Sequence, residues 1–126
     1  MFNLAGKSIL LVDDSEVMRL ILVMHLKRLL GVEVTQAVNG QDALAKFETA
    51  RFDLILTDMV MPEMDGAELI RQVRTRLKSD VPIVMITTKG ESKDRERGLS
   101  LGANDYLTKP VDVKTLLVTI LKHLGK

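Results

Sequence analysis

The stretch LILTDMVMPEMDG, from Leu54 to Gly66, leads an apolar strand pattern directly into an acidic residue. Its first four residues form a short β-rich run, which is typical of a strand that is buried on both faces of a sheet. The run ends at Asp58, and Pro62 turns the chain before the next helical pattern begins. A buried carboxylate is costly unless it is paired, so the position of Asp58 calls for a compensating partner.

The composition predicts one compact domain over residues 1–126, with an aliphatic core. Hydrophobic residues make up 46% of the chain and aromatic residues only 3%. The 18 basic and 17 acidic residues give a net charge of +1, which argues against charge-driven binding of nucleic acid or an anionic membrane. Without cysteine, the chain has no thiolate metal site. It shows neither a signal peptide nor a segment for membrane insertion, so we expect a cytoplasmic domain.

Short β-rich runs alternate with helical patterns along the whole chain. The expected strands are Ser8–Val12, Val32–Ala37, Leu54–Thr57, Pro82–Thr87 and Asp105–Thr108. The expected helices are Ser15–Leu30, Gln41–Thr49, Ala67–Leu77, Lys93–Leu101 and Val113–Leu124. Five strand-then-helix units predict an α/β fold, a single doubly wound (βα)5 domain with helices on both faces of a parallel sheet. The second run alternates apolar and polar residues, which favours an edge strand.

Polar residues stand at the carboxyl ends of four expected strands. They are Asp13-Asp14, Asp58, Thr87-Thr88 and Lys109-Pro110. Each has a simpler explanation, as a helix cap, a solvated acid, an ordinary strand threonine or a turn. In doubly wound folds, however, the carboxyl ends of the strands surround the ligand site, so we expect these groups to share one pocket.

The charges in such a pocket constrain what it binds. Two carboxylates about 5 Å apart repel by about 3 kcal/mol at an effective dielectric constant of ~20. One lysine and one divalent cation would neutralise three carboxylates, and oxygen ligands favour Mg²⁺ over zinc. Mg²⁺, a lysine and a hydroxyl form a phosphoryl-binding arrangement. Asp58 is central among these strands and is the best candidate for a nucleophile that forms an aspartyl-phosphate.

The motifs ILLVDDS, LILTDMVMPEMDG, IVMITT and GANDYLTKP follow one another along nearly the whole chain. In this combination the sequence resembles the response-regulator receiver domain of two-component signalling, of the chemotaxis-receiver type. The resemblance implies strand order 2-1-3-4-5. It also implies that Asp58 accepts a phosphoryl group from a histidine kinase or a histidine phosphotransfer protein. Such a domain is a switch rather than an enzyme, and at most catalyses its own phosphorylation and dephosphorylation.

The resemblance also implies roles for the residues around Asp58. The implied Mg²⁺ ligands are Asp13, Asp14, Asp58 and the backbone carbonyl of Val60. Thr87 would donate a hydrogen bond to the phosphoryl group, and Lys109 would pair with it after a cis bond to Pro110. Tyr106 matches the aromatic residue that moves inward when Thr87 is drawn to the phosphoryl group.

The residues bordering the phosphoryl position vary in the family, and here they are Val60, Thr88 and Lys89. Thr88 is bulkier than the small residue often found there. We therefore expect it to restrict the access of small phosphodonors and of attacking water. Met59, Met61 and Met64 are expected to pack in the core and the loop, and Pro62 and Gly66 to shape the loop without a chemical role.

The first helix has more apolar residues than one buried face requires. A first stripe, expected in the core, contains Met18, Ile21, Leu22, Leu26 and Leu29. A second stripe of Val17, Leu20 and Met24 would then be exposed beside the acidic pocket, as a docking site for a partner helix or as ordinary surface. His25 and His123 lie on expected helices without acidic partners at suitable spacing, which favours packed or solvated histidines.

The sequence is compatible with three hypotheses about the whole protein. The first is a single-domain regulator without an output domain, which acts on an unknown downstream protein or in a phosphorelay and binds no nucleic acid. The second is a receiver fragment of a larger regulator. The third is a phosphatase of the haloacid dehalogenase type, which also uses aspartate, threonine, lysine and Mg²⁺. In that family the nucleophile ends the first strand and a second acid follows two residues later, whereas Val60 follows Asp58 here.

Overall fold

The computed structural model describes residues 4–88 and 90–125 of the chain. Its strands are β1 (Ser8–Val12), β2 (Glu33–Ala37), β3 (Leu54–Asp58), β4 (Ile83–Thr88) and β5 (Asp105–Lys109). Its helices are α1 (Glu16–Leu30), α2 (Gly40–Thr49), α3 (Gly66–Arg71), the π-helical segment η1 (Gln72–Arg76), α4 (Ser92–Leu101) and α5 (Val113–Leu124).

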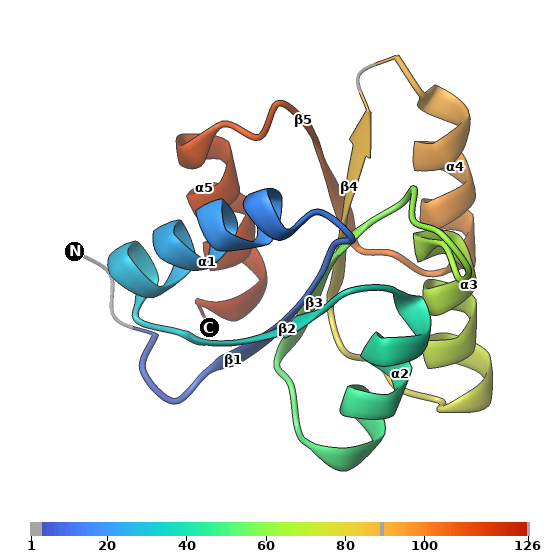
Figure 1. Cartoon of the computed structure of the whole chain (residues 1–126), viewed down its shortest axis with the longest axis horizontal. Coiled ribbons are helices and arrows are strands. Elements are labelled where there is room, and N and C mark those ends of the chain that lie inside the picture. Colours follow the sequence, from blue (N-terminus) through green and yellow to red (C-terminus); the bar gives the residue numbers. More distant parts are fainter. Residues whose placement is uncertain (1–3, 89, 126) are drawn as a thin grey trace.

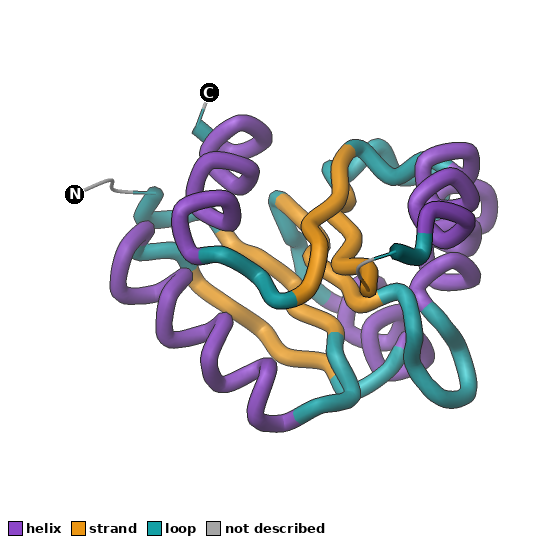
Figure 2. The backbone as a smooth tube through the Cα atoms, turned by 90° about the horizontal axis from the view of Figure 1, so that it is seen from above, coloured by secondary structure: helices purple, strands orange, loops and turns teal. Residues whose placement is uncertain are grey.

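The strands form one parallel sheet in the order β2-β1-β3-β4-β5, between two layers of helices (Figures 1 and 2). In Figure 1, α1 and α5 cover one face, and α2, α3 and α4 cover the other. The predicted α/β fold, the strand order and the position of β2 at an edge are therefore confirmed. None of the helices in the described ranges has the length and apolar character that crossing a bilayer requires.

Alternate residues of the central strands pack into two separate hydrophobic cores, one on each face of the sheet. On β1, Leu10 and Val12 pack toward α2 and α3, while Ile9 and Leu11 pack toward α1 and α5. All four side chains are fully buried. Every residue of β3 is buried too, including Asp58 at its end. A strand covered on both faces explains why the apolar run in LILTD does not alternate with polar residues.

Side-chain caps begin α1, α2, α3 and α5. Ser15 accepts a hydrogen bond from the amide of Met18 at the start of α1, and Asp65 accepts one from Glu68 at the start of α3. Each cap satisfies a backbone N–H that the first helical turn leaves without a partner. The parallel pairing of the strands places their carboxyl ends at one edge of the sheet, where these helices begin.

The expected helix over Ala67–Leu77 is confirmed to within a residue at each end, but only α3 is α-helical, and after Arg71 the helix continues as the π-helical η1. The amide of Leu77 donates to the carbonyl of Gln72, five residues earlier. Within η1, Arg74 donates to the backbone oxygens of Ser79 and Gly102 and to the side chain of Asn104. Apolar spacing over one turn does not distinguish an i+4 from an i+5 hydrogen bond, so the sequence pattern gave no signal for this segment.

Gly66 allows the start of α3 to contact the backbone of β3. A Cβ at this position would lie 2.8 Å from the Cα of Met59 and even closer to the carbonyl oxygen of Asp58. The amide of Gly66 also donates to the carbonyl of Met59, at 3.0 Å. Gly98 on α4 is in close contact as well, but its neighbour is the flexible thioether of Met85.

These two glycines predict different costs for the same substitution. Gly66→Ala should lower the free energy of unfolding by about 1–3 kcal/mol, because the new methyl group meets backbone that cannot move alone. Gly98→Ala is the matched control: Met85 can change rotamer, and alanine gains about 1 kcal/mol in helix propensity. Urea denaturation of both variants measures the difference. A Gly66→Ala protein as stable as Gly98→Ala would contradict the assignment.

Candidate functional site

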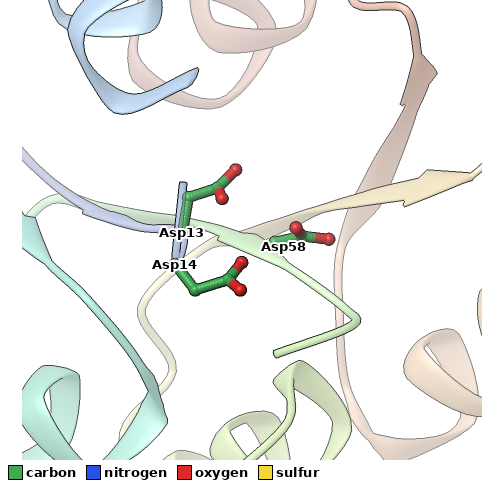
Figure 3. Close-up of side chains that lie close together, drawn as sticks. All are labelled: Asp13, Asp14 and Asp58. Atoms are coloured by element: carbon green, nitrogen blue, oxygen red, sulfur yellow. The ribbon is translucent and has the colours of Figure 1, made fainter. Parts of the chain in front are cut away.

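The carboxyl ends of four adjacent strands bring the predicted polar residues to one edge of the sheet. Asp13 and Asp14 follow β1, Asp58 ends β3, Thr87 lies near the end of β4 and Lys109 ends β5. One carboxylate oxygen from each of the three aspartates lies within 4.8 Å of the others. Figure 3 shows the three carboxylates at the ends of β1 and β3, turned the same way. The structure thus forms the acidic cluster that the sequence predicts.

The carboxylate of Asp58 is buried, and two donors among the described residues hold it. Lys109 Nζ lies 2.9 Å from its Oδ2, and the amide of Val60 donates to its Oδ1 at 3.2 Å. The Asp58 side chain is only 6% exposed, whereas that of Lys109 is 31% exposed. The aspartate is therefore fixed in position, and one of its two partners is a side chain that reaches in from the solvent edge.

One carboxylate oxygen of Asp13 lacks a hydrogen-bond partner among the described residues. Its Oδ1 accepts a hydrogen bond from the amide of Ser15 at 2.9 Å. Its Oδ2 is buried and has no hydrogen-bond partner among the described residues. Burial raises the pKa of the Asp13 carboxyl above its ordinary value, and the charges of Asp58 and Asp14 act in the same direction. A buried carboxylate oxygen without a partner, next to two further carboxylates, fits a hard divalent cation.

Lys109 supplies part of the compensating charge. Burial by itself would lower the pKa of its ammonium group, but the hydrogen bond and the charge of Asp58 raise it above the ordinary value. Three carboxylates and one ammonium group leave a formal charge of minus two, which equals the charge that one Mg²⁺ ion would neutralise. The Lys109–Pro110 bond is cis, as the resemblance implies.

Thr87 is buried at this edge of the sheet, whereas Tyr106 on β5 is exposed. Thr87 is 1% exposed, and its hydroxyl donates to the carbonyl of Leu107 on β5 at 3.4 Å. Tyr106 is 38% exposed and lies beside α4, where the guanidinium of Arg95 stands 5.2 Å from the ring centre. The ring therefore faces outward in this structure. The switch roles of Thr87 and Tyr106 stay predictions.

Of the residues expected to border the phosphoryl position, the two that the structure describes are exposed. Val60 is 62% exposed, and Thr88 at the end of β4 is exposed too. Lys89 lies outside the described residues. The proposed effect of Thr88 on access, and the use of the Val60 carbonyl as a metal ligand, stay predictions. Met59 and Met61 are buried in the core with Met64 packed against it, as expected.

The exposed stripe of α1 is confirmed and is wider than expected. Val17, Leu20 and Met24 are 67%, 56% and 52% exposed. Ile21, which is expected in the core stripe, is 42% exposed, so that prediction is wrong. The buried stripe of α1 consists of Arg19, Leu22, Leu26 and Leu30. The apolar pattern places the buried face of α1 incorrectly, because one of the buried positions is occupied by an arginine.

Two further side chains were missed by sequence reasoning. Arg19 donates from its NH1 to the backbone carbonyl of Asp13 at 2.8 Å. Arg19 lies three residues before Leu22 and seven before Leu26, and this helical spacing predicts that it shares their buried face. His123 on α5 was expected to lack an acidic partner, but its Nε2 lies 3.1 Å from Asp105 Oδ2 on β5. This partner is distant in sequence, so spacing along the helix could not reveal it.

Comparisons with known proteins agree with this geometry. The family model of the response regulator receiver domain matches residues 9–121. The alkaline phosphatase synthesis transcriptional regulatory protein PhoP of Bacillus subtilis is 45% identical over 105 residues, or 83% of this chain and 43% of that protein. The phosphate regulon transcriptional regulatory protein PhoB of Pseudomonas aeruginosa is 39% identical over 126 residues, or 97% of this chain and 55% of that protein. The chain spans about half the length of these relatives.

Solved structures show the same similarity in three dimensions. The chemotaxis response regulator CheY4 of Vibrio cholerae superposes with a TM-score of 0.86 at 38% identity, over 94% of this chain and 98% of that chain. A CheY-like receiver domain protein of Methanospirillum hungatei superposes with a TM-score of 0.87 at 32% identity, over 94% of each chain. Sequence, fold and the arrangement of acids thus agree, and the chain belongs to the response regulator receiver domain family.

Proposed function

We propose that this chain is a Mg²⁺-dependent phosphoacceptor switch in which Asp58 is the residue that is phosphorylated. Receiver domains take phosphoryl groups from histidine kinases, and they are switches rather than classical enzymes. The observation that carries the proposal is the buried Asp58 carboxylate, which Lys109 and Val60 hold, together with the Asp13 oxygen that has no partner among the described residues. This arrangement suits a group that gains negative charge during the reaction.

The proposed reaction is a transfer between a histidine and an aspartate. A carboxylate oxygen of Asp58 forms the bond to phosphorus while the phosphorus–nitrogen bond of a phosphohistidine breaks. The imidazole nitrogen leaves with the electron pair of that bond. Asp13, Asp14, Asp58 and the Val60 carbonyl would hold Mg²⁺, which when bound offsets the negative charge of the phosphoryl group. Lys109 then pairs with the phosphoryl oxygens in place of the free carboxylate.

The proposed switch links this reaction to β5. The Thr87 hydroxyl, which donates to the Leu107 carbonyl in this structure, would turn to a phosphoryl oxygen. Tyr106 would then leave its position beside Arg95 and move inward. These changes alter the surface formed by α4, β5 and α5, and they would change its affinity for a downstream protein.

Two aspects of the whole protein belong to this proposal. The stand-alone role over residues 1–126 stays a prediction, because the chain spans only about half of its curated relatives. Those relatives are named as transcriptional regulators, so the expected lack of a nucleic-acid partner is also still a prediction. The proposed phosphodonor is a histidine kinase or a histidine phosphotransfer protein, and we propose that it docks on the exposed stripe of α1.

Asp58→Asn should abolish phosphoryl incorporation, because an amide oxygen is a poor nucleophile. Wild type and variant are incubated with Mg²⁺ and either phosphoramidate or a phosphorylated histidine phosphotransfer protein. Intact-mass spectrometry counts the phosphoryl groups gained. Asp80→Asn, at an exposed position away from the sheet edge, is the control and should behave like wild type. Equal incorporation in Asp58→Asn would contradict the assignment, as would a wild type that is unmodified by both donors.

Asp13→Asn should stabilise the protein in EDTA, because it removes a buried charge while its oxygen can still accept from Ser15. We expect the free energy of unfolding to rise by about 1–3 kcal/mol. Mg²⁺ should stabilise the wild type through binding to the folded state, and should stabilise the variant much less. Urea denaturation with EDTA or Mg²⁺ tests both effects. The proposed metal site is wrong if the two proteins gain equally from Mg²⁺.

Glutamate on the exposed stripe of α1 should impair docking of the phosphodonor. Val17→Glu and Leu20→Glu each place a charge in an apolar contact, so the rate of transfer from a phosphotransfer protein should fall by about tenfold or more. Phosphorylation by phosphoramidate should not change, which shows that the pocket is intact. Leu99→Glu on α4, across the sheet and 43% exposed in wild type, is the matched control. Equal transfer rates in all three variants would exclude docking on α1.

A further inference from the structure

Arg19 is a buried arginine that makes no ion pair with a carboxylate of the described residues. It is only 9% exposed, on the inner face of α1. No Asp or Glu oxygen of the described residues lies within 4.0 Å of its guanidinium in an ion pair. Arginine is rarely buried without a charged partner, so this position calls for an explanation.

The guanidinium instead donates hydrogen bonds to two neutral oxygens, one on Asp13 and one on Gln36. Its NH1 donates to the carbonyl of Asp13 at 2.8 Å, and its Nε donates to Gln36 Oε1 on β2 at 3.1 Å. The amide of Asp13 donates to the carbonyl of Ala37, also on β2, at 3.1 Å. Both polar backbone groups of Asp13 are thus held, one by α1 and the other by β2.

The carbonyl of Asp13 belongs to the peptide group that links Asp13 to Asp14. A hydrogen bond to this oxygen fixes the plane of that peptide, and the plane sets the directions in which both side chains leave the backbone. One bond from Arg19 therefore orients two of the three acids in the cluster. The bond is to a neutral oxygen, so Arg19 acts through geometry and not by pairing with a carboxylate.

The support extends from Arg19 to α2. The backbone carbonyl of Gln36 accepts a hydrogen bond from Lys46 Nζ at 2.6 Å, and Lys46 also pairs with Asp42 at 3.2 Å. Gln36 is therefore held by α2 while it holds Arg19. A lysine at position 19 could not reproduce this arrangement, because it has one compact ammonium group and not two nitrogens in a rigid plane.

We propose that Arg19 is a positioning residue for the acidic cluster: it holds the Asp13–Asp14 peptide so that the carboxylates face a shared cation. The inference rests on the proposed function, since it assumes that the cluster binds Mg²⁺. Replacing a residue that hydrogen-bonds to a metal ligand and orients it typically lowers metal affinity about 10–100-fold. Arg19 acts through the backbone, so we expect the lower end of this range.

The test measures Mg²⁺ affinity directly, by calorimetric titration of the unphosphorylated protein. Arg19→Met should raise the Kd about tenfold. Arg19→Lys and Gln36→Met each keep part of the arrangement and should give smaller increases. Arg74→Met is the matched control, because Arg74 also donates to backbone oxygens but lies far from the acids in sequence, in η1. It should lower thermal stability and leave the Kd unchanged.

A second readout distinguishes positioning from a loss of stability. The amide of Asp14 belongs to the peptide whose oxygen Arg19 binds, so its ¹H–¹⁵N signal should shift in the Arg19 and Gln36 variants and not in Arg74→Met. Unchanged Mg²⁺ affinity in folded Arg19→Met would overturn the proposal. If that variant does not fold, the same result in Arg19→Lys and Gln36→Met would overturn it. A wild type that binds no Mg²⁺ would instead overturn the proposed function and this inference with it.

Discussion

The repulsion among three carboxylates at one edge of the sheet is the constraint on which the site depends. Parallel strands place their carboxyl ends together, so the acids after β1 and at the end of β3 come within 4.8 Å of one another. Lys109 offsets one charge, and the amides of Ser15 and Val60 each donate to one oxygen. These interactions leave Asp13 with a buried oxygen that lacks a partner in the described structure. The folded protein therefore retains an unfavourable charge distribution that a bound cation would relieve.

The sequence predicted the fold because its signals are local and repeated. Apolar runs such as LILT identify strands that are covered on both faces, and their alternation with helical patterns defines the sheet. The bounds of β1 are as expected, those of the other strands differ by one residue at one or both ends, and β3 includes Asp58 itself. The acidic cluster was predictable for a related reason, since parallel strands bring their last residues to the same edge.

The features that sequence reasoning missed depend on contacts between distant segments. The partner of His123 lies on β5, eighteen residues earlier, so no helical spacing could reveal it. The widened turn of η1 differs from an α-helix by one residue in its hydrogen bonding, which the apolar pattern does not register. Arg19 occupies a position where a buried apolar residue would be expected, and this shifted Ile21 into the predicted core. In each case, the polarity of a residue does not reveal which hydrogen-bond partner it will find in the folded protein.

The contact at Gly98 has a mechanical consequence for α4. The helix rests on the thioether of Met85, and the methyl group of Met59 is nearby. Met59 follows Asp58 directly, and Met85 is two residues before Thr87, so both supports are attached to the strands that carry the reactive groups. Methionine has three rotatable side-chain bonds and adapts its shape at low cost. The packing beneath α4 is therefore deformable. When the strands move slightly, the methionine side chains can change rotamer, and the backbone of the helix is not strained.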